Sequence, residues 1–179
     1  MKHLIIGGAR SGKSRLAQHL ASQWQQQTGG EVVVVATAEC QPGQGTMAAR
    51  IAHHKAHRPA HWRTIEAPRQ LASTLRNESS AQRLLMVDCL TLWLANEMAC
   101  GQWPEQKSAL LDTLPSLPGP VLLVGNEVGQ GIVPLGEQNR RFVDEAGWLH
   151  QHLGDRVEQV TLVVAGLPLT LKEAGHDTQ

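Results

Sequence analysis

Five short, mainly apolar runs punctuate the chain, and none of them alternates polar with apolar positions. Continuous apolar runs are typical of strands that are buried on both faces, as in a parallel sheet that helices cover. The predicted strands are 3–6, 32–37, 84–88, 121–125 and 160–165.

Apolar residues recur at helical spacing between these predicted strands. In segment 13–27, Leu16, Leu20 and Trp24 follow one another at intervals of four residues, which gives one apolar face. Segment 140–153 repeats the pattern. Its apolar residues are Phe142, Ala146, Leu149 and Leu153. Strands that alternate with helices predict right-handed β-α-β units and an α/β fold with a mostly parallel sheet covered by helices on both faces.

Turn residues separate the predicted elements without dividing the chain into parts. Gly29 and Gly30 end the first predicted helix, and loops rich in proline and glycine occupy 41–45 and 114–120. The sequence contains no internal repeat and no long linker, and 179 residues suit one domain. We therefore expect a single domain, 1–179.

The composition argues against several classes of protein. Sixteen basic and 16 acidic residues give a formal net charge of zero, which argues against nucleic acid or an anionic membrane surface as a partner. No run approaches the ~20 apolar residues of a membrane span. Three cysteines without a C-x-x-C pair indicate a reducing compartment, so we expect a cytoplasmic protein with no membrane insertion. Five Trp, one Phe and no Tyr predict an aliphatic core.

Residues 7–14, GGARSGKS, satisfy the pattern G-x-x-x-x-G-K-[ST] without a mismatch. Glycines let the backbone curl so that successive N–H groups face phosphate oxygens, and the following helix adds the positive end of its dipole. Lys13 would neutralise phosphate charge, and Ser14 would coordinate Mg²⁺. The competing interpretation is a glycine-rich turn with a structural role, but the predicted strand before the motif and the helix after it favour a nucleoside-triphosphate site. That site would comprise Gly7, Gly8, Ala9, Arg10, Ser11, Gly12, Lys13 and Ser14.

Asp88 ends the apolar run 84–88 with a carboxylate. In P-loop proteins such an aspartate lies beside the phosphate loop and holds Mg²⁺, often through water. The alternative is an ordinary helix cap, since segment 91–98 has a helical pattern. The P-loop motif in the same chain favours the metal role.

Segment 47–58 contains three of the nine histidines. On a helix, Arg50, His53 and His57 would share one polar face. Three interpretations remain open: a transition-metal site, for which no third ligand is suitably spaced; a solvated basic face; or a nucleophilic histidine that attacks phosphorus while Arg50 and Lys55 stabilise the charge.

Segment 121–134 runs from an apolar strand into Asn126, Glu127 and a loop with two glycines. Ligands of open α/β sheets bind beyond the carboxyl ends of the strands, where these two residues would lie. Glu127 could accept a proton from a substrate hydroxyl or support a metal ligand. The alternative is a loop carboxylate that caps a turn.

Taken in order, these segments resemble one family. The motifs on which the resemblance rests are GGARSGKS, ARIAHHKAHRPAHW, the strand that ends in Asp88, GNEVGQGIVP and the closing VVAGLPLTLK. The family is the bifunctional adenosylcobinamide kinase / adenosylcobinamide-phosphate guanylyltransferase of cobalamin biosynthesis. The resemblance implies a P-loop, RecA-like α/β fold, assembly as a homotrimer, and two reactions. These are phosphorylation of adenosylcobinamide by GTP or ATP, and transfer of GMP from GTP to adenosylcobinamide phosphate.

The resemblance also implies roles for particular residues. A histidine in the HHK segment carries a covalent guanylyl group in this family, and its position matches His53. The chemistry of the motifs adds Lys13 and Glu127 as catalytic residues, the lysine for phosphate charge and the glutamate as base, with Ser14 and Asp88 holding Mg²⁺. Further nucleotide contacts would be Ala36, Thr37, Ala38, Arg50, His54, Lys55, Ala56, His57, Glu66 and Asp88, in addition to the P-loop. Segment 134–141 departs from the family pattern.

Two other functions compete with this hypothesis. One is a P-loop switch that hydrolyses GTP without transferring a group, although the N-K-x-D motif of common GTPases is absent. The other is a metal-binding module that uses the histidine cluster. Trp93 and Trp103 fit a subunit interface or, more simply, the core.

Overall fold

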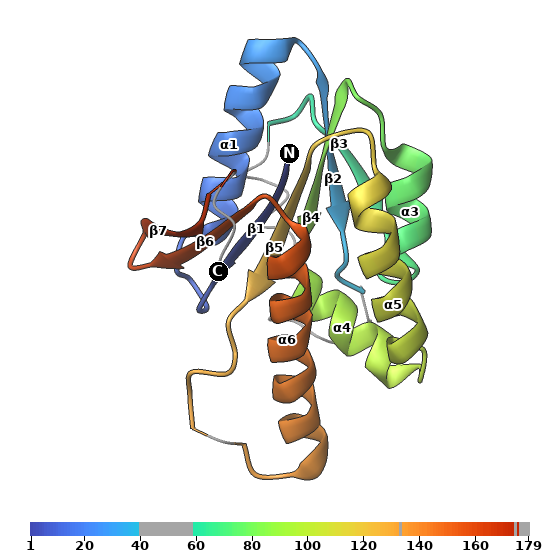
Figure 1. Ribbon diagram of the computed structural model, residues 1–179, viewed down its shortest axis with the longest axis vertical. Helices are drawn as coiled ribbons and strands as arrows, with labels where there is room; N and C mark the ends of the chain where they lie inside the picture. The colour runs from blue at the N-terminus through green and yellow to red at the C-terminus, as the bar shows by residue number, and fades with distance from the viewer. Residues whose placement is uncertain (40–58, 133, 174, 176–179) are drawn as a thin grey trace.

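A computed structural model describes residues 1–39, 59–132, 134–173 and 175. In these residues seven strands form one sheet in the order β3-β2-β4-β5-β1-β6-β7, shown in Figure 1. Neighbouring strands are parallel except β6 and β7, which form an antiparallel hairpin. The strands are β1 (Lys2–Gly7), β2 (Glu31–Ala36), β3 (Arg63–Glu66), β4 (Arg83–Asp88), β5 (Val121–Asn126), β6 (Gln159–Val164) and β7 (Leu167–Lys172).

Helices cover both faces of the sheet, as the sequence predicts. In Figure 1, α1 lies on the left of the sheet, and α3 and α5 lie on the right. The described helices are α1 (Lys13–Thr28), α3 (Leu71–Glu78), α4 (Leu90–Ala99), α5 (Trp103–Thr113) and α6 (Glu137–Arg156), with a 3₁₀ turn at Leu114–Ser116. None of these described helices is long and apolar enough to cross a membrane.

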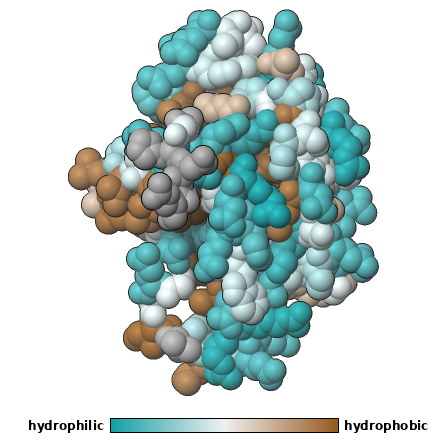
Figure 2. Space-filling view, in the orientation of Figure 1, coloured by the Kyte–Doolittle hydropathy of each residue, from teal (hydrophilic) through white to brown (hydrophobic). Residues whose placement is uncertain are grey.

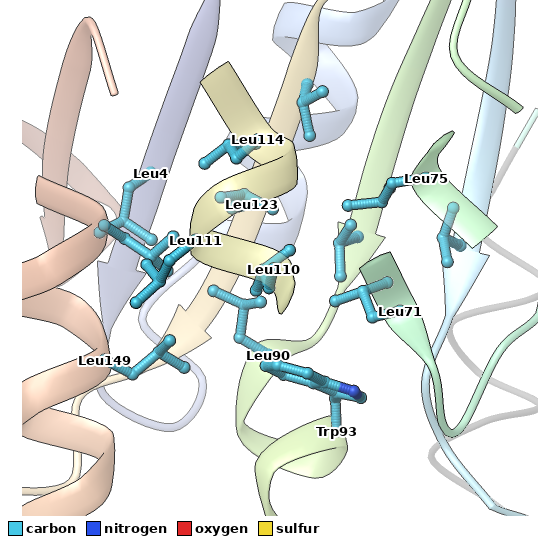
Figure 3. Close-up of a cluster of buried hydrophobic side chains, with 14 of the residues drawn as sticks. Leu4, Leu71, Leu75, Leu90, Trp93, Leu110, Leu111, Leu114, Leu123 and Leu149 are labelled. Atoms are coloured by element: carbon cyan, nitrogen blue, oxygen red, sulfur yellow. The ribbon is translucent and has the colours of Figure 1, made fainter. Parts of the chain in front are cut away.

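The sheet divides the core into two clusters because successive side chains of a strand point to opposite faces. Leu4 belongs to the cluster that contains residues of α3, α4, α5 and α6, whereas Ile5 belongs to the cluster that contains residues of α1. Figure 3 shows part of the larger cluster, where leucines from the strands and helices meet and Trp93 lies at the lower edge. Along α1 the fully buried positions are Ala17 and Ala21, flanked by the half-buried Leu16, Leu20 and Trp24.

The core is mainly aliphatic, as the composition predicts, and it also contains buried tryptophans. Trp93 and Trp103 are fully buried and meet edge to face with ring centroids 5.2 Å apart. Both tryptophans therefore belong to the core. Few aromatic residues are present, but three of the five tryptophans, including Trp62, are buried.

Four elements were not predicted from the apolar pattern. The edge strand β3 has only four residues, and most of its side chains are exposed, so it lacks an apolar run. Strand β7 contains a proline and exposed leucines, because it pairs on one side only. Helices α3 and α5 were also missed. The main sign of helix α5 in the sequence is Pro104, which lies in the first turn, where a helix tolerates proline.

Candidate functional site

The P-loop lies between the end of β1 and the start of α1, at the carboxyl edge of the sheet. Arg10 and Gly12 both have left-handed backbone conformations, with φ of 57° and 100°. A Cβ atom on Gly7 would lie 2.5 Å from the Val163 carbonyl oxygen and 2.6 Å from Ser11 Oγ. The tight curl of residues 7–14 thus requires glycine at its first position.

The first turn of α1 has no side-chain cap, because its N-cap residue is Gly12. The leading N–H groups and the positive end of the helix dipole therefore face the loop, which suits a phosphate. Lys13 is 7% exposed, and its Nζ donates a hydrogen bond of 2.9 Å to the Gly8 carbonyl oxygen. Burial lowers the pKa of Lys13, and the nearby Cys89 and Asp88 oppose that shift. A buried ammonium group inside the loop is poised to exchange its carbonyl partner for a phosphate oxygen.

Three of the predicted nucleotide contacts form a row at the ends of adjacent strands. Ala36 is in register with Glu66 on β3 and with Asp88 on β4. Asp88 is also close enough to Lys13 to influence its pKa. The sheet thus places one carboxylate at the end of β4 beside the P-loop lysine, as the sequence interpretation requires.

Thr37 connects the end of β2 to β4 and α4. The hydroxyl of this fully buried residue donates to the Cys89 carbonyl oxygen at 2.6 Å and accepts from the Cys89 N–H at 2.8 Å. Asn96 Nδ2 donates to the carbonyl oxygens of both Thr37 and Pro68. Sequence analysis missed Asn96, whose only signal is that it is a polar residue in a largely apolar helix. Ala38, the next predicted contact, is half-buried beyond this junction.

Glu127 is held on the other side of the P-loop. Its backbone N–H donates to the Gly7 carbonyl oxygen at 2.9 Å, and its Oε1 accepts from the Gly129 N–H at 2.7 Å. The other carboxylate oxygen, Oε2, lies 3.9 Å from His150 Nδ1 on α6. Burial lowers the pKa of His150, although the Glu127 carboxylate opposes the shift. His150 fits beneath β5 because Gly125 has no side chain: a Cβ there would lie 2.7 Å from His150 Nε2.

A cavity of about 570 Å³ lies between the P-loop, the loop after β5 and the turn of the β6–β7 hairpin. Ser11 and Glu127 line it from two of these segments, and Val164 from the third. The hairpin turn docks on the phosphate loop, since the Gly166 N–H donates to the Ser11 carbonyl oxygen at 2.9 Å. The Ser11 hydroxyl oxygen is buried and has no hydrogen-bond partner among the described residues.

The residues available for a metal ion are oxygen donors. Ser14, in the first turn of α1, and Asp88, at the end of β4, offer a hydroxyl and a carboxylate, which are hard ligands of the kind Mg²⁺ prefers. Residues 1–39, 59–132 and 134–173 contain no group of three His, Cys, Asp or Glu side chains that could hold a metal ion by themselves. The donor set thus fits a Mg²⁺ ion that is held jointly with nucleotide phosphates.

The histidine segment falls outside the described residues. The predicted positions in it are Arg50, His53, His54, Lys55, Ala56 and His57. The structure consequently brings together the P-loop, Asp88 and Glu127. The role of His53 as nucleophile stays a prediction from the sequence.

Comparisons with known proteins agree on one family. The profile described as "Cobinamide kinase / cobinamide phosphate guanyltransferase" matches residues 3–171. The chain is 56% identical over 176 residues to the bifunctional adenosylcobalamin biosynthesis protein CobP of Pseudomonas aeruginosa, covering 96% of this chain and 98% of that protein. It is 36% identical over 188 residues to the bifunctional adenosylcobalamin biosynthesis protein CobU of Salmonella typhimurium, covering 96% of this chain and all of the relative.

Among solved structures, an ATPase domain superimposes with a TM-score of 0.58, and the match covers 98% of this chain and 78% of that one. The two sequences are only 14% identical, so this likeness concerns the fold alone. It confirms the predicted P-loop, RecA-like architecture.

Proposed function

Since the chain belongs to the cobinamide kinase / cobinamide phosphate guanyltransferase family, we propose that the P-loop site serves both of the family's reactions. The chain is a bifunctional enzyme of adenosylcobalamin biosynthesis with kinase and guanylyltransferase activities. This assignment replaces the GTPase switch and the metal-binding module as hypotheses. The observation that carries the proposed site is the buried Lys13 at the uncapped start of α1, beside a cavity that Glu127 lines.

In the kinase step, a hydroxyl of cobinamide attacks the terminal phosphorus of GTP or ATP, the bond to the β-phosphate oxygen breaks, and GDP or ADP leaves. The P-loop N–H groups and Lys13 hold the phosphates and offset the charge that develops on them. Glu127 accepts the hydroxyl proton, because its carboxylate is fixed by Gly129 at the cavity wall. Mg²⁺, held by Ser14 and Asp88, would supply further charge neutralisation on the phosphates.

In the guanylyl step, His53 attacks the α-phosphorus of GTP. A P–N bond forms, the bond to the β-phosphate oxygen breaks, and pyrophosphate leaves. The phosphate of cobinamide phosphate then attacks the same phosphorus, which releases His53 and gives cobinamide-GDP. Arg50, Lys55 and the neighbouring His54, Ala56 and His57 would contact the nucleotide during this step.

The remaining expectations stay proposals of the same kind. We infer a single domain, a homotrimeric assembly, no nucleic-acid partner and a cytoplasmic location, supported by the family resemblance and by the balanced charge of the sequence. Ala36, Thr37, Ala38 and Glu66 are proposed nucleotide contacts on the basis of their position at the carboxyl edge of the sheet.

The test is product analysis with cobinamide and GTP as substrates. Wild-type protein should yield first cobinamide phosphate and then cobinamide-GDP, resolved by mass spectrometry. Lys13→Ala should lower the rates of both steps by roughly a hundredfold or more, since the same loop holds the triphosphate each time. The control is Arg156→Ala, which removes an exposed cation at the end of α6, away from the P-loop, and should retain both rates. A Lys13→Ala protein that phosphorylates cobinamide at the wild-type rate would contradict the assignment of this site.

A further inference from the structure

Most of the exposed large apolar side chains of the described residues lie on two segments that also contribute residues to the lining of the P-loop cavity. Apart from Met1, all of them lie on the β5–α6 connection, on α6 or on the β6–β7 hairpin. They are Ile132, Leu135, Trp148, Val164, Leu167, Leu169 and Leu171. Figure 2 shows brown surface over the hairpin on the left and again on the connection below it. Exposed apolar groups that cluster in this way mark a binding surface more often than scattered ones do.

The hairpin continues one wall of the cavity outward. Leu162 and Val164 line the cavity, and on the neighbouring strand they pair with Leu169 and Leu167. Side chains that are paired across antiparallel strands point to the same face of the sheet. Leu167 and Leu169, which are 72% and 56% exposed, therefore extend the apolar wall beyond the mouth of the cavity.

The connection between β5 and α6 continues the opposite wall. Gln130 and Gly131 line the cavity, and the chain then carries Ile132 at 97% exposure and Leu135 at 93%. Two pairs of exposed apolar residues thus continue two walls of the proposed phosphate-binding cavity. We call Leu167 and Leu169 the hairpin rim, and Ile132 and Leu135 the loop rim.

The size of the cavity limits what can lie inside it. Pockets of ~300–1,000 Å³ enclose drug-sized ligands, and this one has about 570 Å³ and must also admit the phosphates of the P-loop site. Cobinamide is far larger: a corrin macrocycle with amide side chains and a short arm that ends in the reacting hydroxyl. When the hydroxyl reaches the phosphates inside the cavity, the arm is too short for the macrocycle to follow. The macrocycle therefore stays at the mouth of the cavity, beside both rims.

We propose that the hairpin rim and the loop rim bind the corrin macrocycle of cobinamide by apolar contact and so determine the affinity for the corrinoid substrate. This proposal rests on the proposed function, because it takes the hydroxyl to be phosphorylated at the P-loop. The rims contribute contact area and carry no charge, so they act on corrinoid binding and leave the handling of the nucleotide to the P-loop.

The experiment compares serine substitutions in the rims with a matched position. The variants are Leu167→Ser/Leu169→Ser and Ile132→Ser/Leu135→Ser, with Leu171→Ser as the control. Leu171 is a similarly exposed leucine of the same strand, but it falls at the irregularity in the pairing and has no cavity-lining partner. Equilibrium dialysis, in which cobinamide is measured by its absorbance, gives the affinity for cobinamide. Steady-state kinetics give KM for each substrate. Sedimentation equilibrium gives the assembly state.

Each rim variant should bind cobinamide about tenfold more weakly, with KM for cobinamide raised in proportion. KM for GTP, kcat at saturating cobinamide and the assembly state should match wild type, and Leu171→Ser should match wild type throughout. Leu167→Met/Leu169→Met should restore the affinity, since methionine keeps the apolar contact.

Two results would overturn the proposal. One is wild-type affinity for cobinamide in both rim variants. The other is a loss of affinity that appears only as the variants dissociate, which would make this face an interface between copies of the chain. Failure of the proposed function is distinguishable, because wild-type protein would then bind cobinamide without phosphorylating it.

Discussion

Glu127 is fixed at the cavity wall by contacts of both its backbone and its side chain. Its N–H donates to the Gly7 carbonyl oxygen, one carboxylate oxygen accepts from the Gly129 N–H, and the other faces His150. A residue held in this way offers one oxygen in a defined direction, which is what a general base requires.

Glu127→Gln should therefore separate the two activities. Glutamine keeps the volume and can still accept from the Gly129 N–H, but it cannot take up a proton. The rate of cobinamide phosphorylation should fall by roughly 10²–10⁴-fold, whereas transfer of GMP to supplied cobinamide phosphate should persist. Glu137→Gln, at an exposed position on α6, is the matched control. Equal loss of both activities in Glu127→Gln would instead make Glu127 part of the shared nucleotide site.

At the residue scale, the predictable part of the site is the part that is local in sequence. The P-loop could be identified because its residues are consecutive and each has a function that depends on its residue type. Asn96 and His150 could not, because their partners, Thr37 and Glu127, lie 59 and 23 positions away. No spacing rule connects them. Only the packing of α4 and α6 against the sheet does so.

The helices on the larger face of the sheet are joined by buried tryptophans. Trp103 on α5 stacks edge to face on Trp93, and its Nε1 donates to Glu145 Oε2 on α6 at 2.7 Å. Lys107 donates to the same oxygen at 2.9 Å. Burial raises the pKa of Glu145, but these two hydrogen bonds outweigh it and hold the pKa below its ordinary value. The contact ties α5 to the helix that carries His150.

Trp103→Phe should lower the free energy of unfolding by about 1–3 kcal/mol, because it removes an indole donor from a half-buried carboxylate while retaining a ring. Trp148→Phe, at a half-exposed site on α6, should cost less than about 0.5 kcal/mol. Urea unfolding measures both. A glutamate with a lowered pKa contributes above pH 4.5, its ordinary pKa, and loses that contribution as the pH falls. The difference between wild type and Trp103→Phe should accordingly shrink in acid; a difference that is equal at all pH values would contradict the role of the carboxylate.

At the element scale, burial decided which parts of the fold were predictable. The five inner strands were found because both of their faces are buried, so that each is an apolar run. The edge strands β3 and β7 were not, since their side chains are largely exposed. Helices α1 and α6 were found from their apolar faces. Helices α3 and α5 are shorter, at 8 and 11 residues, and give fewer repeats of the pattern.

The molecule as a whole has no excess of basic residues with which to attract an anion. Its net charge is zero, and the features that suit a phosphate are gathered at one edge of the sheet: the N–H groups of the P-loop, the start of α1 and the buried Lys13. Parallel strands place their carboxyl ends together, so β1, β4 and β5 deliver the P-loop, Asp88 and Glu127 to the same region. A charge-neutral chain can thus hold a triphosphate through local geometry.

The central claim is that one chain uses this edge for phosphoryl transfer and, through His53, for guanylyl transfer. The most direct measurement is incubation with GTP labelled at the α-phosphate, without cobinamide, followed by denaturation and counting of protein-bound label. We expect label that is labile in acid and stable in base, as a phosphoramidate is, and that is absent from His53→Ala while this variant still phosphorylates cobinamide. Wild-type protein that retains no label, or His53→Ala protein that retains it, would contradict the account.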